Sequence, residues 1–131
     1  MRVLLVEDSK VVSERLANLL REQLPPPVEV LQAATAEDAM LLLRAWAPDA
    51  VLLDIQLEEG SGFDVLEKMR AENLTIPVVV LTNHSTPQYR ERCLQAGARA
   101  FFDKSLEFDS AVAAVGQLAQ PDGPRGGENR E

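Results

Sequence analysis

The chain has 131 residues, 46% of them hydrophobic, and a formal net charge of −8 that comes from 21 acidic and 13 basic side chains. This length suits one domain with its own core, and so high an apolar content excludes a disordered chain. The acidic balance argues against non-specific binding to nucleic acid, because such binding needs a basic surface.

The first predicted strand, Val3 to Val6, is a short apolar run that ends in Glu7 and Asp8. The residues before these acids are too few for a signal peptide or a membrane span, and the single cysteine gives no disulfide framework. We therefore expect a cytoplasmic protein. Ser9 is the predicted N-cap of a helix that runs to about Leu24, where three consecutive prolines stop it.

The second predicted strand, residues 28–33, is interrupted by polar side chains, which suits the edge of a sheet. Thr35 is predicted to cap the helix that follows. The third strand, residues 51–53, is continuously apolar, as expected of a strand buried on both faces of a parallel sheet, and it ends in Asp54. Ser61 then opens a third helix.

Residues 76–82 form the fourth predicted strand, which is β-branched and ends in a threonine hydroxyl. Ser85 or Thr86, followed by Pro87, is expected to start the fourth helix, and Gly97 to stop it. The last strand comes directly afterwards and is less apolar, so it is predicted to form the other edge of the sheet.

This fifth strand, residues 99–103, leads to Lys104 and to a last helix that begins at about Ser105. We expect residues 1–118 to form the domain. Residues 119–131, which are rich in proline, glycine and charge, are expected to form a disordered tail.

Five strand–helix units follow one another at intervals of roughly 22 to 27 residues, which is typical of right-handed βαβ crossovers. The predicted fold class is α/β, a doubly wound (βα)5 flavodoxin-like three-layer sandwich with a parallel sheet in the order 2-1-3-4-5. In this order the crossover direction reverses between the first and third strands, and ligands bind at such a reversal.

Four of the five predicted strands end in a reactive side chain, and parallel strands bring these ends to one rim of the sheet. They are Glu7 with Asp8, then Asp54, Thr82 and Lys104. Carboxylates about 4 Å apart repel by roughly 4 kcal/mol at an effective dielectric near 20, so a cation is needed. Oxygen ligands with room for water suit Mg²⁺. A carboxylate nucleophile beside a metal, a hydroxyl and a lysine is what phosphoryl transfer requires.

These residues resemble the receiver domain of the bacterial response regulators over residues 1 to about 118. The resemblance rests on the Leu-Val-Glu-Asp-Ser end of the first strand, the Leu-Leu-Asp at Asp54, Thr82, and the Phe-Phe-Asp-Lys that ends at Lys104. It implies that Asp54 is the phosphoacceptor, that Thr82 hydrogen-bonds the phosphoryl group, and that Lys104 pairs with it.

The resemblance also implies a Mg²⁺ site. Asp8 would be a direct ligand together with Asp54, Glu7 would act through water, and the backbone carbonyl of Gln56 would complete the protein's share. Phe101 matches the aromatic switch position, and we expect its ring to turn inward when the threonine moves toward the phosphoryl group.

Three positions depart from the family pattern. Glu58 stands where the family usually has proline, Asn83 where a small residue is usual, and Ser105 where a cis-linked proline is usual. A cis bond before a residue other than proline costs about 2.5–4 kcal/mol, which favours a trans bond between Lys104 and Ser105.

The resemblance implies a stand-alone phosphorylation switch rather than a separate enzyme. The domain would catalyse only its own Mg²⁺-dependent phosphoryl uptake and hydrolysis. Its partners would be a sensor histidine kinase or phosphotransfer protein and an unknown downstream protein, with no nucleic acid or membrane. A phosphate-independent pseudo-receiver is the alternative. An aspartate-dependent phosphatase usually has a second aspartate where this chain has Gln56.

Two smaller questions stay open at this point. His84 is either a catalytic base at the edge of the site or an exposed loop histidine. The arginines at positions 90, 92 and 99 are either a docking cluster for a partner or solvated surface.

Overall fold

Strands and helices alternate throughout residues 1–119, the part of the chain that this computed structural model describes. The elements are β1 (Arg2–Val6), α1 (Lys10–Gln23), β2 (Glu29–Ala33), α2 (Ala36–Trp46), β3 (Ala50–Leu53), α3 (Gly62–Ala71), β4 (Val78–Thr82), α4 (Pro87–Gln95), β5 (Ala100–Asp103) and α5 (Phe108–Ala119). The described part of the chain has no helix long and apolar enough to cross a membrane.

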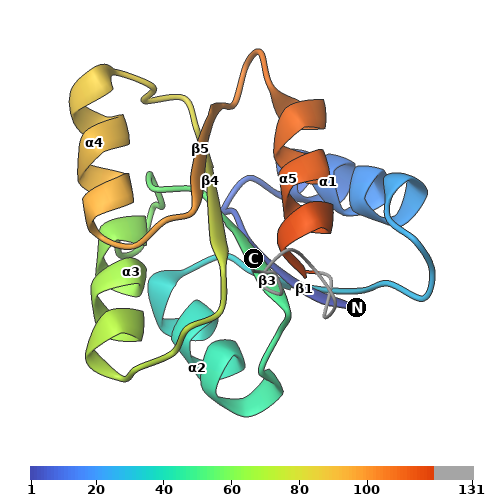
Figure 1. Cartoon of the computed structure of the whole chain (residues 1–131), viewed down its shortest axis with the longest axis horizontal. Helices are drawn as coiled ribbons and strands as arrows, with labels where there is room; N and C mark the ends of the chain where they lie inside the picture. Colours follow the sequence, from blue (N-terminus) through green and yellow to red (C-terminus); the bar gives the residue numbers. More distant parts are fainter. Residues whose placement is uncertain (120–131) are drawn as a thin grey trace, which may run out of the picture.

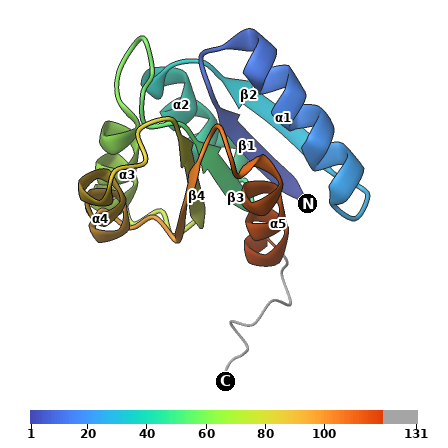
Figure 2. The same cartoon turned by 90° about the horizontal axis from the view of Figure 1, so that it is seen from above.

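The strands form one parallel sheet in the order β2-β1-β3-β4-β5, which confirms the predicted topology. Helices α1 and α5 cover one face, and α2, α3 and α4 cover the other (Figure 1, Figure 2). Each face has its own core, because neighbouring residues of a strand point to opposite sides: Leu4 and Val6 pack under α2 and α3, whereas Val3 and Leu5 pack under α1 and α5. The result is the three-layer α/β sandwich expected from the sequence.

The predicted caps are confirmed. Ser9, Thr35 and Thr86 cap α1, α2 and α4, and each side chain accepts a hydrogen bond from a backbone N–H in the first turn of its helix. Gly97 follows α4 with a φ of 112°, in the left-handed region that glycine adopts without strain. Cys93 is fully buried on α4.

The last helix begins later than predicted. It begins at Phe108 rather than near Ser105, because the backbone carbonyl of Asp103 accepts hydrogen bonds from the N–H groups of Leu106 and Glu107 and closes a turn there. It continues to Ala119, one residue beyond the expected domain boundary. The rest of the expected tail, residues 120–131, lies outside the described residues.

Candidate functional site

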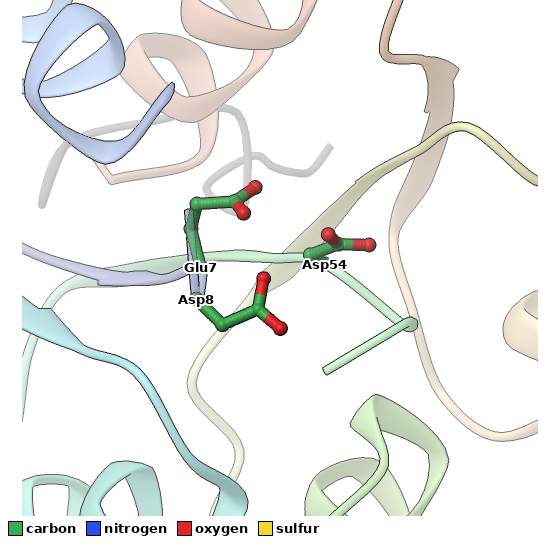
Figure 3. A group of neighbouring side chains, drawn as sticks. All are labelled: Glu7, Asp8 and Asp54. Carbon is green, nitrogen blue, oxygen red and sulfur yellow. The ribbon is translucent and has the colours of Figure 1, made fainter. Parts of the chain in front are cut away.

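Three carboxylates from the ends of two adjacent strands share one space at the rim of the sheet. Glu7 and Asp8 follow β1 and Asp54 follows β3, and in Figure 3 the three side chains extend into the same region. One oxygen of each lies within 4.8 Å of the others. They line a cavity of about 530 Å³ together with Gln56, Lys104 and residues of α1 and the loop after β4.

Lys104 reaches this cluster from the end of β5. Its Nζ lies 2.5 Å from Oε1 of Glu7 and 2.7 Å from Oδ2 of Asp54, and all three side chains are largely buried. Burial alone would lower the pKa of the Lys104 ammonium, but the hydrogen bonds to Asp54 and Glu7 outweigh it, and the pKa is raised. The ammonium therefore stays charged and partly offsets the repulsion between the two carboxylates.

Burial raises the pKa of Glu7, even though Lys104 and the backbone N–H of Ser9 both act to lower it. The effect of desolvation on this pKa is thus larger than the opposite effect of the hydrogen bonds and of the Lys104 charge. The charged form of Glu7 is therefore held at a cost in free energy.

Backbone N–H groups orient each carboxylate. Ser9 donates to Oε2 of Glu7 at 2.8 Å, and Gln56 donates to Oδ1 of Asp54 at 3.0 Å. Glu58 donates to Oδ2 of Asp8 at 2.6 Å. Charge-assisted hydrogen bonds of this kind fix the direction in which an oxygen points.

The Glu58 bond exists because this chain departs from the family pattern. A proline at this position would have no N–H to donate. The loop that carries Glu58 also needs glycine at position 62, since a Cβ there would lie 2.7 Å from the carbonyl oxygen of Asp54. The only sequence signal for this hydrogen bond is the missing proline at position 58.

Thr82 is not among the residues that line the cavity. It is fully buried at the end of β4, and its Oγ1 accepts a hydrogen bond from the backbone N–H of His84 at 3.3 Å. Its own hydroxyl proton remains available to donate. Asn83 and His84 line the cavity in its place.

The structure shows the contacts of His84 and of two of the arginines. His84 is exposed, and its ring packs edge-on against Tyr89 at 5.5 Å. Arg92 lies over the ring of Phe63 at 3.7 Å, and Arg90 donates to the carbonyl oxygen of Phe101 at 3.4 Å. These two arginines are therefore held by groups of the chain itself.

Phe101, the expected switch residue, is buried in this structure. The ring is already 6% exposed and packs in the core beneath α2, α3 and α4. Its position on β5 points it toward that core, where the apolar ring has no hydroxyl to leave unpaired. The movement of this ring on phosphorylation stays a prediction.

The bond between Lys104 and Ser105 is trans, as expected, since the single cis peptide bond among residues 1–119 lies between Pro26 and Pro27. Both the N–H and the hydroxyl of Ser105 bind Oδ1 of Asp103, at 2.8 and 2.7 Å. No local sequence pattern indicates these hydrogen bonds of Asp103, because its partners come from two different loops.

The donor set fits a hard divalent cation. It consists of carboxylate oxygens with one side open to the cavity, and clustered His or Cys ligands are absent from this part of the described structure. Among residues 1–119, Oδ1 of Asp8 accepts no hydrogen bond, whereas Oδ2 accepts one from the N–H of Glu58. Glu7, Asp8 and Asp54 are therefore suited to hold Mg²⁺, while Lys104 already supplies one positive charge.

Comparisons with known proteins agree with this site. A family model described as the response regulator receiver domain matches residues 3–116. The probable transcriptional regulatory protein TcrX of Mycobacterium tuberculosis is 31% identical over 121 residues, which cover 92% of this chain and 50% of that protein. The phosphate regulon regulatory protein PhoB of Escherichia coli is 33% identical over 116 residues, covering 87% and 49%. This chain thus spans about half the length of these curated relatives.

Solved structures show the same fold. The signal receiver domain of the putative response regulator NarL from M. tuberculosis matches with a TM-score of 0.82 and 27% identity, covering 92% of this chain and 96% of that one. The Mn²⁺-bound form of the response regulator Rcp1 matches with a TM-score of 0.72 and 25% identity, covering 88% of each chain.

Proposed function

We propose, since the chain belongs to the family of response regulator receiver domains, that Asp54 accepts a phosphoryl group from a histidine kinase or phosphotransfer protein. Domains of this family serve phosphorylation-dependent signalling in two-component systems and are generally not enzymes in their own right. An oxygen of Asp54 would attack phosphorus as the bond to the donor's imidazole nitrogen breaks, and the product is an acyl phosphate. Asp54 would thus be both the catalytic nucleophile and the modified residue.

The observation that carries this proposal is the pairing of Lys104 with Asp54 inside a cluster of three carboxylates. The lysine stands where negative charge would increase on phosphorylation, and a fixed cation costs no reorganisation at that moment. Thr82 would donate its free hydroxyl proton to a phosphoryl oxygen. Its present hydrogen bond from His84 leaves that proton unused.

Mg²⁺ would be held by Asp8 and Asp54, by the backbone carbonyl of Gln56, and by Glu7 through water. When bound, the ion neutralises phosphoryl oxygens and permits the approach of two anions. The geometry of the carboxylates supports this proposal, and a divalent cation is present in the solved structure of the relative Rcp1. Glu7 forms an ion pair with Lys104, which suits binding of Mg²⁺ through a water molecule better than direct ligation.

Asp8→Asn is expected to weaken Mg²⁺ binding by at least about tenfold, because the variant lacks one anionic ligand. It keeps an oxygen that can accept from Glu58 N–H, and it relieves repulsion within the cluster. Its thermal midpoint without Mg²⁺ should therefore equal or exceed that of the wild type. Calorimetric titration with Mg²⁺ and a melting curve in chelator test both parts, with exposed Asp64→Asn as the control.

The output is proposed to pass through contacts with a downstream protein. The curated relatives are transcriptional regulators about twice as long as this chain, and their further function is not carried over to it. We propose cytoplasmic signalling without direct contact of residues 1–119 with nucleic acid or membrane, in keeping with the acidic balance of the chain.

A pseudo-receiver that works without phosphate is the weaker alternative. Such a protein has no need for a lysine held between two buried carboxylates. Replacing a buried ion pair with apolar residues often leaves the stability of a protein unchanged or increases it. The retained arrangement of Glu7, Asp54 and Lys104 therefore supports the phosphorylation switch.

The test is incubation of the full chain with acetyl phosphate and Mg²⁺, followed by intact-mass measurement. We expect the mass of one phosphoryl group to be added, stable in acid and lost in alkali or hydroxylamine, as an acyl phosphate should be. Chelation of Mg²⁺ should prevent the addition. A chain that stays unmodified with both acetyl phosphate and purified kinases would leave the pseudo-receiver as the better description.

A further inference from the structure

Asp103 connects the two loops that follow β4 and β5. Its Oδ2 accepts a hydrogen bond from the hydroxyl of Ser85 in the β4–α4 loop, and its Oδ1 accepts two from Ser105 in the β5–α5 loop. Because the strands are parallel, both loops lie at the same end of the sheet as the residues that follow β1 and β3, which include the three carboxylates. Within residues 1–119, the bond between Ser85 and Asp103 is the one side-chain hydrogen bond that joins these two loops.

The backbone of Asp103 closes the turn that contains Lys104. Its N–H donates to Oε1 of Glu107 at 2.8 Å, and its carbonyl accepts from the N–H of Glu107 at 2.9 Å. Lys104 sits inside this turn, and its own N–H donates to the carbonyl of Thr82 at 2.9 Å. The backbone of the lysine is thus fixed by Asp103 on one side and by Thr82 on the other.

The arrangement depends on the residue at position 105. A proline there would have neither the N–H nor the hydroxyl that binds Oδ1 of Asp103. Hydrogen bonds from Ser85, and then from Ser105, hold the pKa of the Asp103 carboxyl below its usual value, so it accepts these bonds as a carboxylate. In this chain, hydrogen bonds between Asp103, Ser85 and Ser105 therefore fix the turn that a proline at position 105 would constrain through its ring.

We propose, building on the phosphoacceptor role of Asp54, that Asp103 is a positioning residue for Lys104. It fixes the turn from which the ammonium reaches the phosphorylation site, and through Ser85 it holds the loop that begins at Thr82 in register with that turn. Asp103 itself touches neither the cavity nor the other carboxylates.

The effect is large because a lysine side chain has a long, flexible stem. Its ammonium is held at 2.7 Å from Asp54 only while the backbone at its base stays in place. If the turn loosens, Nζ samples other positions and its charge is no longer fixed where phosphoryl oxygens would lie. Asp103 would thus influence phosphoryl binding without contacting the phosphoryl group.

The test is a double-mutant cycle. Fluorine NMR measures the affinity of the full chain for beryllofluoride in the presence of Mg²⁺. Asp103→Ala should weaken binding about tenfold, which is typical when hydrogen bonds to a charged group are lost. In a Lys104→Ala background the same change should cost less than about twofold, because the group that Asp103 positions is then absent. A purely structural role would reduce affinity by the same factor in both backgrounds.

Ser85→Ala provides a second, milder variant, since Ser85 is exposed and loses only the bond between the loops. It should weaken binding by about threefold and should also lose its effect when Lys104 is replaced. It decides the question if Asp103→Ala does not fold. The matched control is Ser110→Ala, an exposed serine on α5, which should leave the affinity unchanged.

Equal losses in both backgrounds, or no loss in either, would overturn the role of Asp103 while leaving the proposed phosphorylation intact. Failure of the wild-type chain to bind beryllofluoride with Mg²⁺ would instead overturn the phosphoacceptor role of Asp54, and the role of Asp103 with it. The wild-type measurement therefore separates the two failures.

Discussion

Asp54→Asn is expected to abolish the addition of a phosphoryl group by acetyl phosphate. An amide is not a nucleophile under these conditions, so no covalent route remains. The fold should persist, because the amide oxygen can still accept the hydrogen bond from Gln56 that now ends on Oδ1. Intact-mass measurement of wild type and variant, side by side and with Mg²⁺, gives the result directly.

Two controls make this result specific. Asp64→Asn changes an exposed carboxylate on the first turn of α3 and should be labelled as fast as the wild type. Peptide mapping of the labelled wild type should place the phosphoryl group on Asp54. A label on Asp8, or a fully labelled Asp54→Asn variant, would show that the nucleophile has been wrongly assigned.

The features that sequence predicted well depend on neighbouring residues. Ser9 and Thr35 cap helices by hydrogen bonds that span three residues, and such bonds are encoded by local spacing. The alternation of strands and helices predicted the doubly wound order 2-1-3-4-5, and the polar second strand suited an edge of that sheet. The carboxylates then meet because parallel strands end on one rim, so the acidic cluster was predictable without coordinates.

The features that sequence missed depend on how separate loops approach one another. Ser105 has the chemistry of an N-cap, but its N–H and hydroxyl are both used by Asp103, and the helix starts later. The N–H of Glu58 reaches Asp8, 50 residues away, only after β1 and β3 have paired. Both errors arose where a tertiary hydrogen bond competed with a local pattern.

Phe101 shows a different limit. Successive residues on a strand face opposite sides, and the sequence placed Phe101 next to Phe102 without saying which ring is covered. In the structure Phe101 is buried beneath α4, whereas Phe102 is half-buried on the other face. Only the packing of the helices on each face determines this choice.

Lys104→Ala should destabilise the metal-free protein by about 3 kcal/mol, in the range found when one partner of a buried ion pair is removed. The substitution leaves Glu7 and Asp54 largely buried without the ammonium that now lies within 2.7 Å of both. Urea unfolding in chelator measures the loss, and Lys68→Ala, which removes an exposed lysine on α3, should change the stability little.

The loss should depend on pH in a defined direction. Burial already raises the pKa of Glu7, and without Lys104 it should rise further. A carboxyl whose pKa is higher in the folded state binds more protons when folded, so stability increases as the pH falls toward the ordinary range of a glutamate. The deficit of Lys104→Ala is therefore expected to be largest near neutral pH and to shrink toward about pH 5.

Mg²⁺ should reduce the stability loss of Lys104→Ala at neutral pH. The bound ion supplies positive charge to the carboxylates that have lost their ion pairs with the lysine. Saturating Mg²⁺ is thus expected to raise the thermal midpoint of Lys104→Ala by more than that of the wild type. A loss that is the same at both pH values, with and without Mg²⁺, would mean that Lys104 stabilises the fold by packing of its stem. Its charge would then have no part in balancing the site.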